Sequence, residues 1–151
     1  MSGPDLFFDS SALLAGIISD RGAARALLLL ADAGLLTVIV SEQVIAETER
    51  AMARRVPRAL MAYREAMRST GLRIVRNPSP GETEAHEDVT AHPADVPTVV
   101  AAMKAGVDYV VTLNRRHLVD DPGVAARSGL RIGTPEGALT WVREQLEQED
   151  R

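Results

Sequence analysis

Short apolar runs alternate along this chain with longer segments in which apolar positions follow a helical period. The short runs are rich in β-branched and aromatic residues, which is typical of buried strands. The predicted strands are residues 6–9 (LFFD), 35–40, 72–75, 107–113 and 130–133. The predicted helices are residues 10–18, 22–34, 41–56, 57–71, 96–106 and 135–148. Residues 76–95 are polar and rich in Pro and Gly, and they show no clear periodicity.

Strands that alternate with helices predict an α/β fold of three layers, with a central parallel sheet of four to five strands covered on both faces. The 151 residues suffice for one domain with a sizeable core, which we expect over residues 5–140. Parallel sheets of this kind place their functional sites at the carboxyl ends of the strands.

Composition narrows the class of protein only moderately. Hydrophobic residues make up 46% of the chain, which indicates a globular protein, and the net charge of −4 does not by itself indicate nucleic-acid binding. The chain has no Cys, so it has no disulfide and no thiolate metal site, which suits the cytoplasm. No signal peptide is recognisable, and Asp32 and Gly34 interrupt the longest apolar tract, so we expect no membrane span.

Four polar residues stand where they could meet at one edge of the sheet. Asp9 ends the first predicted strand, Glu47 lies in the helix after the second, and Asp95 starts the helix before the fourth. Asn114 follows the end of the fourth strand. Three carboxylates and an amide make an oxygen-rich site, which Mg²⁺ or Mn²⁺ prefers and zinc does not. Such a cluster is also expected to raise the pKa of at least one of its acids.

Each of these residues has an alternative role. Asp9 and Asp95 could simply cap the helices that follow them, and Asn114 could be an ordinary turn residue. Glu47 and Glu49 both flank the apolar face of their helix, so periodicity does not choose between them.

The order of these segments resembles the PIN domain, the nuclease fold of VapC-type toxins. The stretch FFDSSALLA resembles the family's opening strand and first acid, and VSEQVIAETER resembles the segment that carries its second acid. The longest match is HPADVPTVVAAMKAGVDYVVTLNRRHL, in which an Asp, an Ala-rich helix, an apolar strand and Thr-x-Asn follow one another.

This resemblance implies a metal-dependent endoribonuclease in which Asp9, Glu47 and Asp95 hold Mg²⁺ or Mn²⁺. Asn114 would take the family's fourth position, which is often Asp. It also implies RNA as substrate, a toxin role with an antitoxin partner, and a homodimer. Beside these ligands, Ser10 and Thr112 could supply hydroxyls that orient the acids. Contacts to RNA phosphates are expected from three consecutive residues, Arg115, Arg116 and His117.

Other interpretations remain open at this level. A phosphotransferase of the HAD class also opens with an Asp after a strand, but Ser11 stands where its second Asp belongs. A PIN scaffold that binds RNA or a protein without cutting is the main alternative, because Asn114 lowers the charge of the site. A metal cluster of His86, Asp88 and His92 is less favoured, because these residues lie in the irregular polar segment. The basic run Arg50, Arg54, Arg55 and Arg58 is either a solvated helix face or an approach to nucleic acid.

Overall fold

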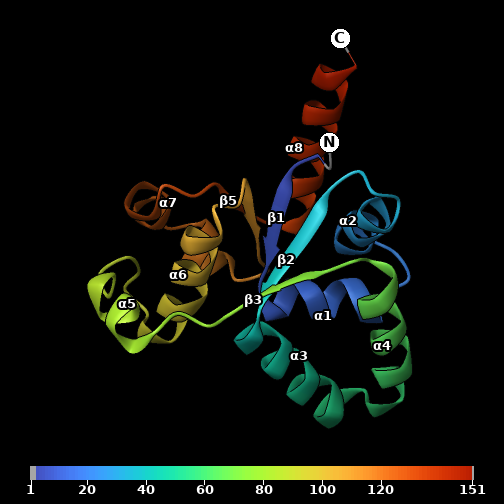
Figure 1. The fold of residues 1–151 in the computed structure, drawn as a ribbon, viewed down its shortest axis with the longest axis horizontal. Coiled ribbons are helices and arrows are strands. Elements are labelled where there is room, and N and C mark those ends of the chain that lie inside the picture. Colours follow the sequence, from blue (N-terminus) through green and yellow to red (C-terminus); the bar gives the residue numbers. More distant parts are fainter. Residues whose placement is uncertain (1–2, 151) are drawn as a thin grey trace.

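The computed structural model describes residues 3–150 and has a five-stranded parallel sheet at its centre (Figure 1). The strands stand in the order β3-β2-β1-β4-β5. Their bounds are Asp5–Phe8 (β1), Thr37–Ser41 (β2), Arg73–Val75 (β3), Tyr109–Val111 (β4) and Ile132–Gly133 (β5). The predicted α/β architecture with four to five parallel strands is therefore confirmed.

The helices cover the sheet on both sides. Figure 1 shows α1, α3 and α4 on one side of β1 and β2, and α5, α6 and α7 on the other, while α8 extends beyond the sheet. Their bounds are Ser10–Ile18 (α1), Ala23–Asp32 (α2), Glu42–Arg55 (α3), Leu60–Ser69 (α4), Pro80–Ala85 (α5), Val96–Ala105 (α6), Pro122–Ser128 (α7) and Pro135–Glu149 (α8). Short helical turns of other types occupy Pro57–Ala59, Pro93–Asp95 and Arg115–Val119.

The two central strands β1 and β2 each contain three consecutive apolar residues, because both faces of these strands are covered. Leu6, Phe7 and Phe8 of β1 have no exposed surface, and the same holds for Val38 and Ile39 of β2. A strand with only one buried face would instead alternate apolar and polar residues. The uninterrupted apolar run from Leu6 to Phe8 is therefore explained by the burial of β1 between two layers of helices.

Two parts of the chain differ from the sequence-based expectation. The polar segment 76–95 contains α5, which Ser79 and Glu82 stabilise by a reciprocal capping box. Residues 114–129, for which no element is predicted, contain the turn Arg115–Val119 and α7. Both α5 and α7 are short, at six and seven residues, so they leave little periodicity to detect. Their capping residues are the signal that the sequence does contain.

Strand order decides where a site can form. The chain passes from β1 outward through β2 to β3, and then returns to place β4 on the opposite side of β1. Helices after β1 and after β4 therefore leave the sheet on different sides, and a crevice opens between them at the carboxyl ends of the strands. Asp9 lies at this position, and its backbone N–H donates to the Val111 carbonyl at 3.2 Å.

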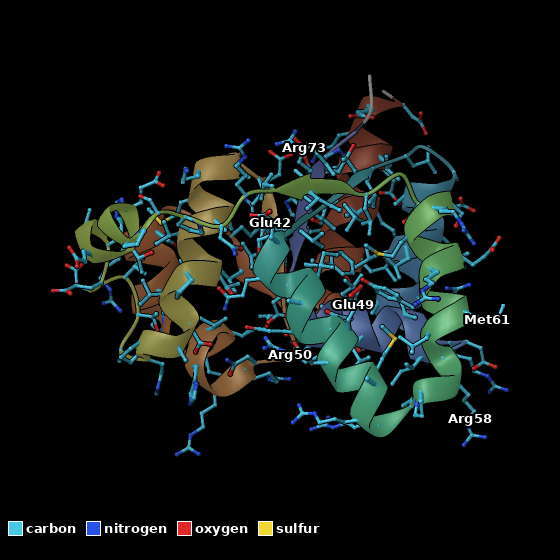
Figure 2. The ribbon with its side chains drawn as sticks, turned by 60° about the horizontal axis from the view of Figure 1, so that its bottom comes forward. Glu42, Glu49, Arg50, Arg58, Met61 and Arg73 are labelled. Carbon is cyan, nitrogen blue, oxygen red and sulfur yellow. The ribbon has the colours of Figure 1, made fainter. Side chains whose placement is uncertain are left out.

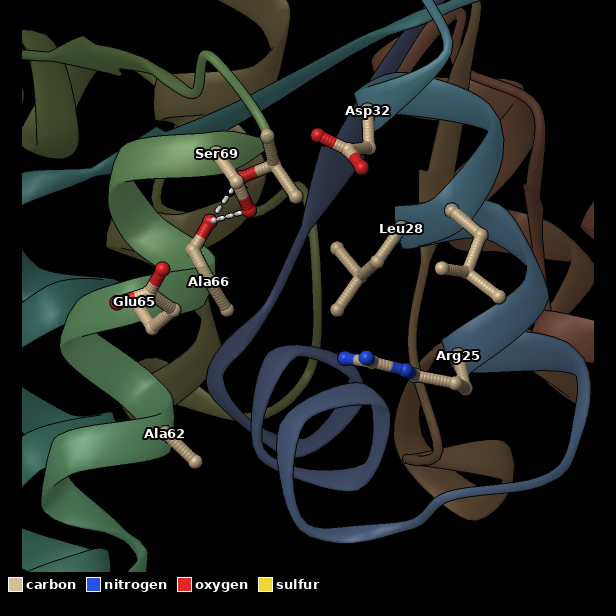
Figure 3. Close-up of a pocket in the computed structure, with 9 residues that line it drawn as sticks. Arg25, Leu28, Asp32, Ala62, Glu65, Ala66 and Ser69 are labelled. Carbon is tan, nitrogen blue, oxygen red and sulfur yellow. Dashed lines mark hydrogen bonds between the residues drawn. The ribbon is translucent and has the colours of Figure 1, made fainter.

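A separate cleft lies between α2 and α4. Arg25, Leu28 and Asp32 line it from α2, and Glu65 and Ser69 line it from α4 (Figure 3). None of its lining residues is a predicted site residue. Within residues 3–150, no helix is long and apolar enough to span a membrane.

Candidate active site

Asp9 follows β1 directly, and its side chain is buried, with 9% of its surface exposed. Its Oδ1 accepts hydrogen bonds from the Ser11 hydroxyl at 2.6 Å and from the Ala12 backbone N–H at 3.0 Å. Its Oδ2 accepts from the hydroxyl of Thr112, just beyond β4. The bond from Ala12 makes Asp9 the N-cap of α1. Asp9 therefore does cap α1, which the sequence analysis gave as the alternative to a role in metal binding. Its side chain also links the end of β1 to the end of β4.

Burial raises the pKa of Asp9 above its ordinary value of 3.8, because the charged carboxylate loses its hydration. Hydrogen bonds from Ser11, Thr112 and Ala12 oppose that rise, and the charge of Asp95 adds to it. The sequence argument attributed a raised pKa to repulsion among clustered acids. Burial is instead the largest cause, and repulsion from Asp95 is the smallest.

Glu47 and Glu49 leave α3 in different directions. The Glu47 carboxylate accepts from the Ser10 hydroxyl at 3.0 Å and from the Gln43 side-chain amide at 2.8 Å. Glu49 instead accepts from the Tyr63 hydroxyl of α4 at 3.2 Å, and Figure 2 shows it on the α4 side of α3. The fold thus places Glu47, and not Glu49, beside the residues that follow β1.

Asp95 immediately precedes α6, but its side chain makes no capping hydrogen bond there. Its Oδ2 lies 3.5 Å from the Asn114 side-chain nitrogen and 3.4 Å from the His117 Nδ1. Asn114 also accepts the His117 backbone N–H at its Oδ1, at 3.2 Å. The His117 ring stacks on His92, with 3.4 Å between the ring centroids. Asp95 is therefore directed toward the end of β4 and not toward its own helix.

The predicted acids line one cavity of about 320 Å³, which we call the acidic cavity. Its lining residues are Asp9, Ser10, Ser11, Glu47, Ala94, Asp95, Thr98, Asn114 and Leu118. Thr112 is fully buried behind it, where its hydroxyl donates to Asp9 and accepts the Asn114 backbone N–H at 2.9 Å. The sequence argument missed two lining hydroxyls, Ser11 and Thr98. Ser11 follows Asp9 by two residues and Thr98 follows Asp95 by three, so their spacing to the acids was the available signal.

The segment that carries these residues also matches a known family. Residues 5–116 match the PIN domain family. This chain belongs to the PIN domain family. PIN domains are generally nucleases that use divalent metals. The match covers all four candidate residues, from Asp9 to Asn114.

Two solved structures share the PIN fold with this chain. PAE2754 from Pyrobaculum aerophilum is 18% identical, with a TM-score of 0.63, over 96% of this chain and 98% of that one. VapBC2 from Rickettsia felis, solved bound to a DNA fragment from its promoter, is 15% identical, with a TM-score of 0.61, over 86% and 98%. No curated protein matches the chain at a significant level. Identities this low establish the fold alone.

The donor types in the acidic cavity of this PIN domain fit a hard divalent cation. Its carboxylate and amide oxygens are the ligands that Mg²⁺ and Mn²⁺ prefer. Among residues 3–150, no three His, Asp or Glu side chains are gathered around one point. That finding contradicts the less favoured cluster of His86, Asp88 and His92, and it applies equally to Asp9, Glu47 and Asp95, whose carboxylates line one cavity without being gathered around one point. The acids share a cavity, while the Glu47 oxygens are occupied by hydrogen bonds from Ser10 and Gln43.

The residues expected to contact RNA phosphates differ in their surroundings. Arg115 lies 3.9 Å from the carboxylate of Asp120, with both side chains exposed, and Arg116 is exposed. His117 is directed at Asp95 and stacked on His92. A contact between these three residues and RNA stays a prediction.

Proposed function

We propose that this PIN domain is an endoribonuclease that needs Mg²⁺ or Mn²⁺ and hydrolyses phosphodiester bonds in single-stranded or looped RNA. The observation that carries the proposal is the acidic cavity at the carboxyl ends of β1 and β4. Asp9, Glu47 and Asp95 come from three distant parts of the chain, and all three line it. If Asp9, Glu47 and Asp95 were only helix caps or solvated residues, nothing would require them to line the same cavity.

The chain's own residues have distinct tasks in this proposal. Asp9, Glu47, Asp95 and Asn114 would hold the cation. A bound divalent cation neutralises the charge of the phosphodiester and lowers the pKa of water, which supplies the nucleophile. The hydroxyls of Ser11 and Thr112 hold the Asp9 carboxylate in one orientation, and Ser10 does the same for Glu47. These fixed orientations keep the acids in place when the anionic substrate approaches.

Removal of metal tests the proposal directly. Purified protein should cleave an unstructured oligoribonucleotide in the presence of Mg²⁺ or Mn²⁺, because the cation offsets the repulsion between the acids and the phosphate. EDTA should abolish cleavage, and added Mn²⁺ should restore it. The measurement is product formation on a denaturing gel, with a mock preparation as control. Cleavage that persists in EDTA at an equal rate would refute metal dependence.

A PIN scaffold that binds without cutting is the second candidate. It is favoured by Asn114, whose side chain hydrogen-bonds Asp95 and caps the turn Arg115–Val119 and carries no charge. Binding of RNA without product in either Mg²⁺ or Mn²⁺ would support this candidate over the nuclease.

Asn114→Asp should strengthen Mn²⁺ binding by about tenfold, because an added negative ligand raises the affinity of an oxygen site. Isothermal calorimetry measures the dissociation constant. Asn77→Asp is the matched control, because it adds the same charge to the chain at a residue that does not line the acidic cavity. An unchanged dissociation constant in Asn114→Asp, or an equal gain in Asn77→Asp, would place Asn114 outside the metal site.

We also propose that the protein is the toxin of a toxin–antitoxin pair, with an antitoxin as partner and a homodimer as its own assembly. The likeness to VapBC2 and the sequence resemblance support this proposal. A small reading frame directly upstream, whose product co-purifies with this chain and inhibits it, would be the decisive observation. That the whole chain forms a single domain stays a prediction.

A further inference from the structure

A second hollow, along α3, adjoins the acidic cavity. This second hollow is lined by Ser10, Glu47, Arg50, Ala51, Ala53 and Arg54, so it shares Ser10 and Glu47 with the acidic cavity. Its volume is about 660 Å³, against about 320 Å³ for the acidic cavity. We call it the arginine groove. A strand that enters the acidic cavity therefore has a path beyond it, along the surface of α3.

Helix geometry places the two arginines beside Glu47. Arg50 and Arg54 follow Glu47 by three and seven residues, so all three side chains lie on one side of α3. Figure 2 shows Arg50 on the side of α3 away from Glu49 and α4. The two arginines are separated by about 6 Å along the helix axis, at 1.5 Å per residue. The small side chains of Ala51 and Ala53 leave the space between them open.

The charges of both arginines are available to a ligand. Across residues 3–150, no carboxylate lies within 4.0 Å of Arg50 or Arg54, whereas Arg68, Lys104 and Arg115 each have such a partner. Both groove arginines are exposed. A guanidinium in this state can bind a phosphate by two parallel hydrogen bonds without first breaking an ion pair.

We propose that the arginine groove binds the RNA backbone next to the cleaved bond, with Arg50 and Arg54 each contacting a phosphate. This inference rests on the proposed function. The acids repel the phosphodiester that they must receive, and the net charge of −4 gives the protein no general attraction for RNA. Arg50 and Arg54, one helical turn apart in the hollow that adjoins the acidic cavity, supply that attraction locally. Their spacing suits successive phosphates of an extended strand.

The competing explanation is that the arginines only stabilise the end of α3. Arg54 and Arg55 both lie in the last turn of the helix, where a positive charge interacts favourably with the helix dipole. Arg55 is exposed as well, but it does not line the arginine groove. Arg55→Ala is therefore the matched control, because it removes a charge of the same kind from the same turn.

The test measures how RNA binding depends on salt. A fluorescein-labelled, unstructured oligoribonucleotide is titrated in EDTA at several KCl concentrations, and the dissociation constant is read by fluorescence anisotropy. In single strands, each phosphate contact contributes about 0.7 to the slope of log affinity against log salt. The double variant Arg50→Ala, Arg54→Ala should therefore bind more weakly and lose about 1.4 from that slope. Arg55→Ala should keep the wild-type slope, and Arg50→Lys with Arg54→Lys should keep most of it.

The outcomes separate this inference from the proposed function. A wild-type slope in the double variant, or an equal loss in Arg55→Ala, overturns the arginine groove while cleavage by the wild type stands. A wild type that neither cleaves nor binds RNA overturns both. Where the wild type cleaves but binds too weakly for anisotropy, the salt slope of kcat/KM is compared by the same criterion.

Discussion

Replacement of Asp95 by asparagine should lower the rate of RNA cleavage at least about a hundredfold, because metal catalysis depends strongly on the charged ligands of the cation. The substitution keeps the shape of the side chain and removes one negative charge. Its cost to folding should be small, since the Asp95 side chain makes no capping bond to α6. Asp9→Asn should have a loss of the same size. The measurement is kcat/KM in saturating Mg²⁺, with melting curves to confirm that each variant is folded.

A pair of neighbouring glutamates on α3 provides the sharpest control. Glu47→Gln should lower cleavage by a similar factor, because Glu47 lines the acidic cavity. Glu49→Gln should leave cleavage within about twofold of wild type, since Glu49 bonds Tyr63 on the other side of the helix, and surface changes of this kind are usually small in effect. Equal loss in both variants would mean that the helix and not the acidic cavity is being perturbed. Equal retention in both would remove Glu47 from the site.

Asp9→Asn should stabilise the metal-free protein at neutral pH, although it should also lower the rate of cleavage. Burial raises the folded-state pKa of Asp9 above the ordinary 3.8. The folded state therefore holds the proton more tightly than the unfolded state. That contribution to stability is fully present below pH 3.8 and is lost as pH rises through the folded-state pKa. Asparagine does not titrate, so the variant escapes the loss.

The pH trend isolates the charge from the change in hydrogen bonding. An amide at position 9 can keep the bonds from Ser11 and Ala12, but the Thr112 hydroxyl must turn to accept instead of donating. That rearrangement costs the same at every pH. The melting temperature of Asp9→Asn minus that of wild type, both in EDTA, should thus grow from acid to neutral pH. A change of about 1 kcal/mol shifts the melting temperature of a domain this size by about 2–4 °C, which is easily resolved.

Magnesium should reverse the comparison. It binds the folded form only, so it should raise the melting temperature of wild type and that of Asp9→Asn much less. Asp121→Asn is the matched control: Asp121 caps α7 by a bond from the Gly123 N–H and lies outside the acidic cavity. It should keep the full magnesium shift of the wild type. If Asp9→Asn behaved as Asp121→Asn does, Asp9 would be only a helix cap.

The sequence alone was sufficient for the elements whose signals are local. Runs such as LFF and VIV are apolar at every position because the strands are buried on both faces, and alternation with helices then gives a parallel sheet. It was also sufficient to select Asp9, Asp95 and Asn114 as candidates, because each stands at the end of an apolar run or the start of a helix. Its failures at α5 and α7 have a local cause as well. Helices of six and seven residues are too short for their periodicity to show.

Tertiary structure decided which side chains from distant segments of the chain lie next to one another. Periodicity left Glu47 and Glu49 equivalent, and within the sequence only the family resemblance favoured Glu47. The packing of α4 against α3 gives the physical reason: it directs Glu49 to Tyr63 and leaves Glu47 at the acidic cavity. The buried state of Asp9 arises because β4 returns to the far side of β1 and brings Thr112 against its carboxylate. The arginine groove likewise exists only because Ser10 of α1 lies beside α3. Sequence determines the chemistry of each side chain and its local conformation, whereas strand order and helix packing determine which of those side chains meet.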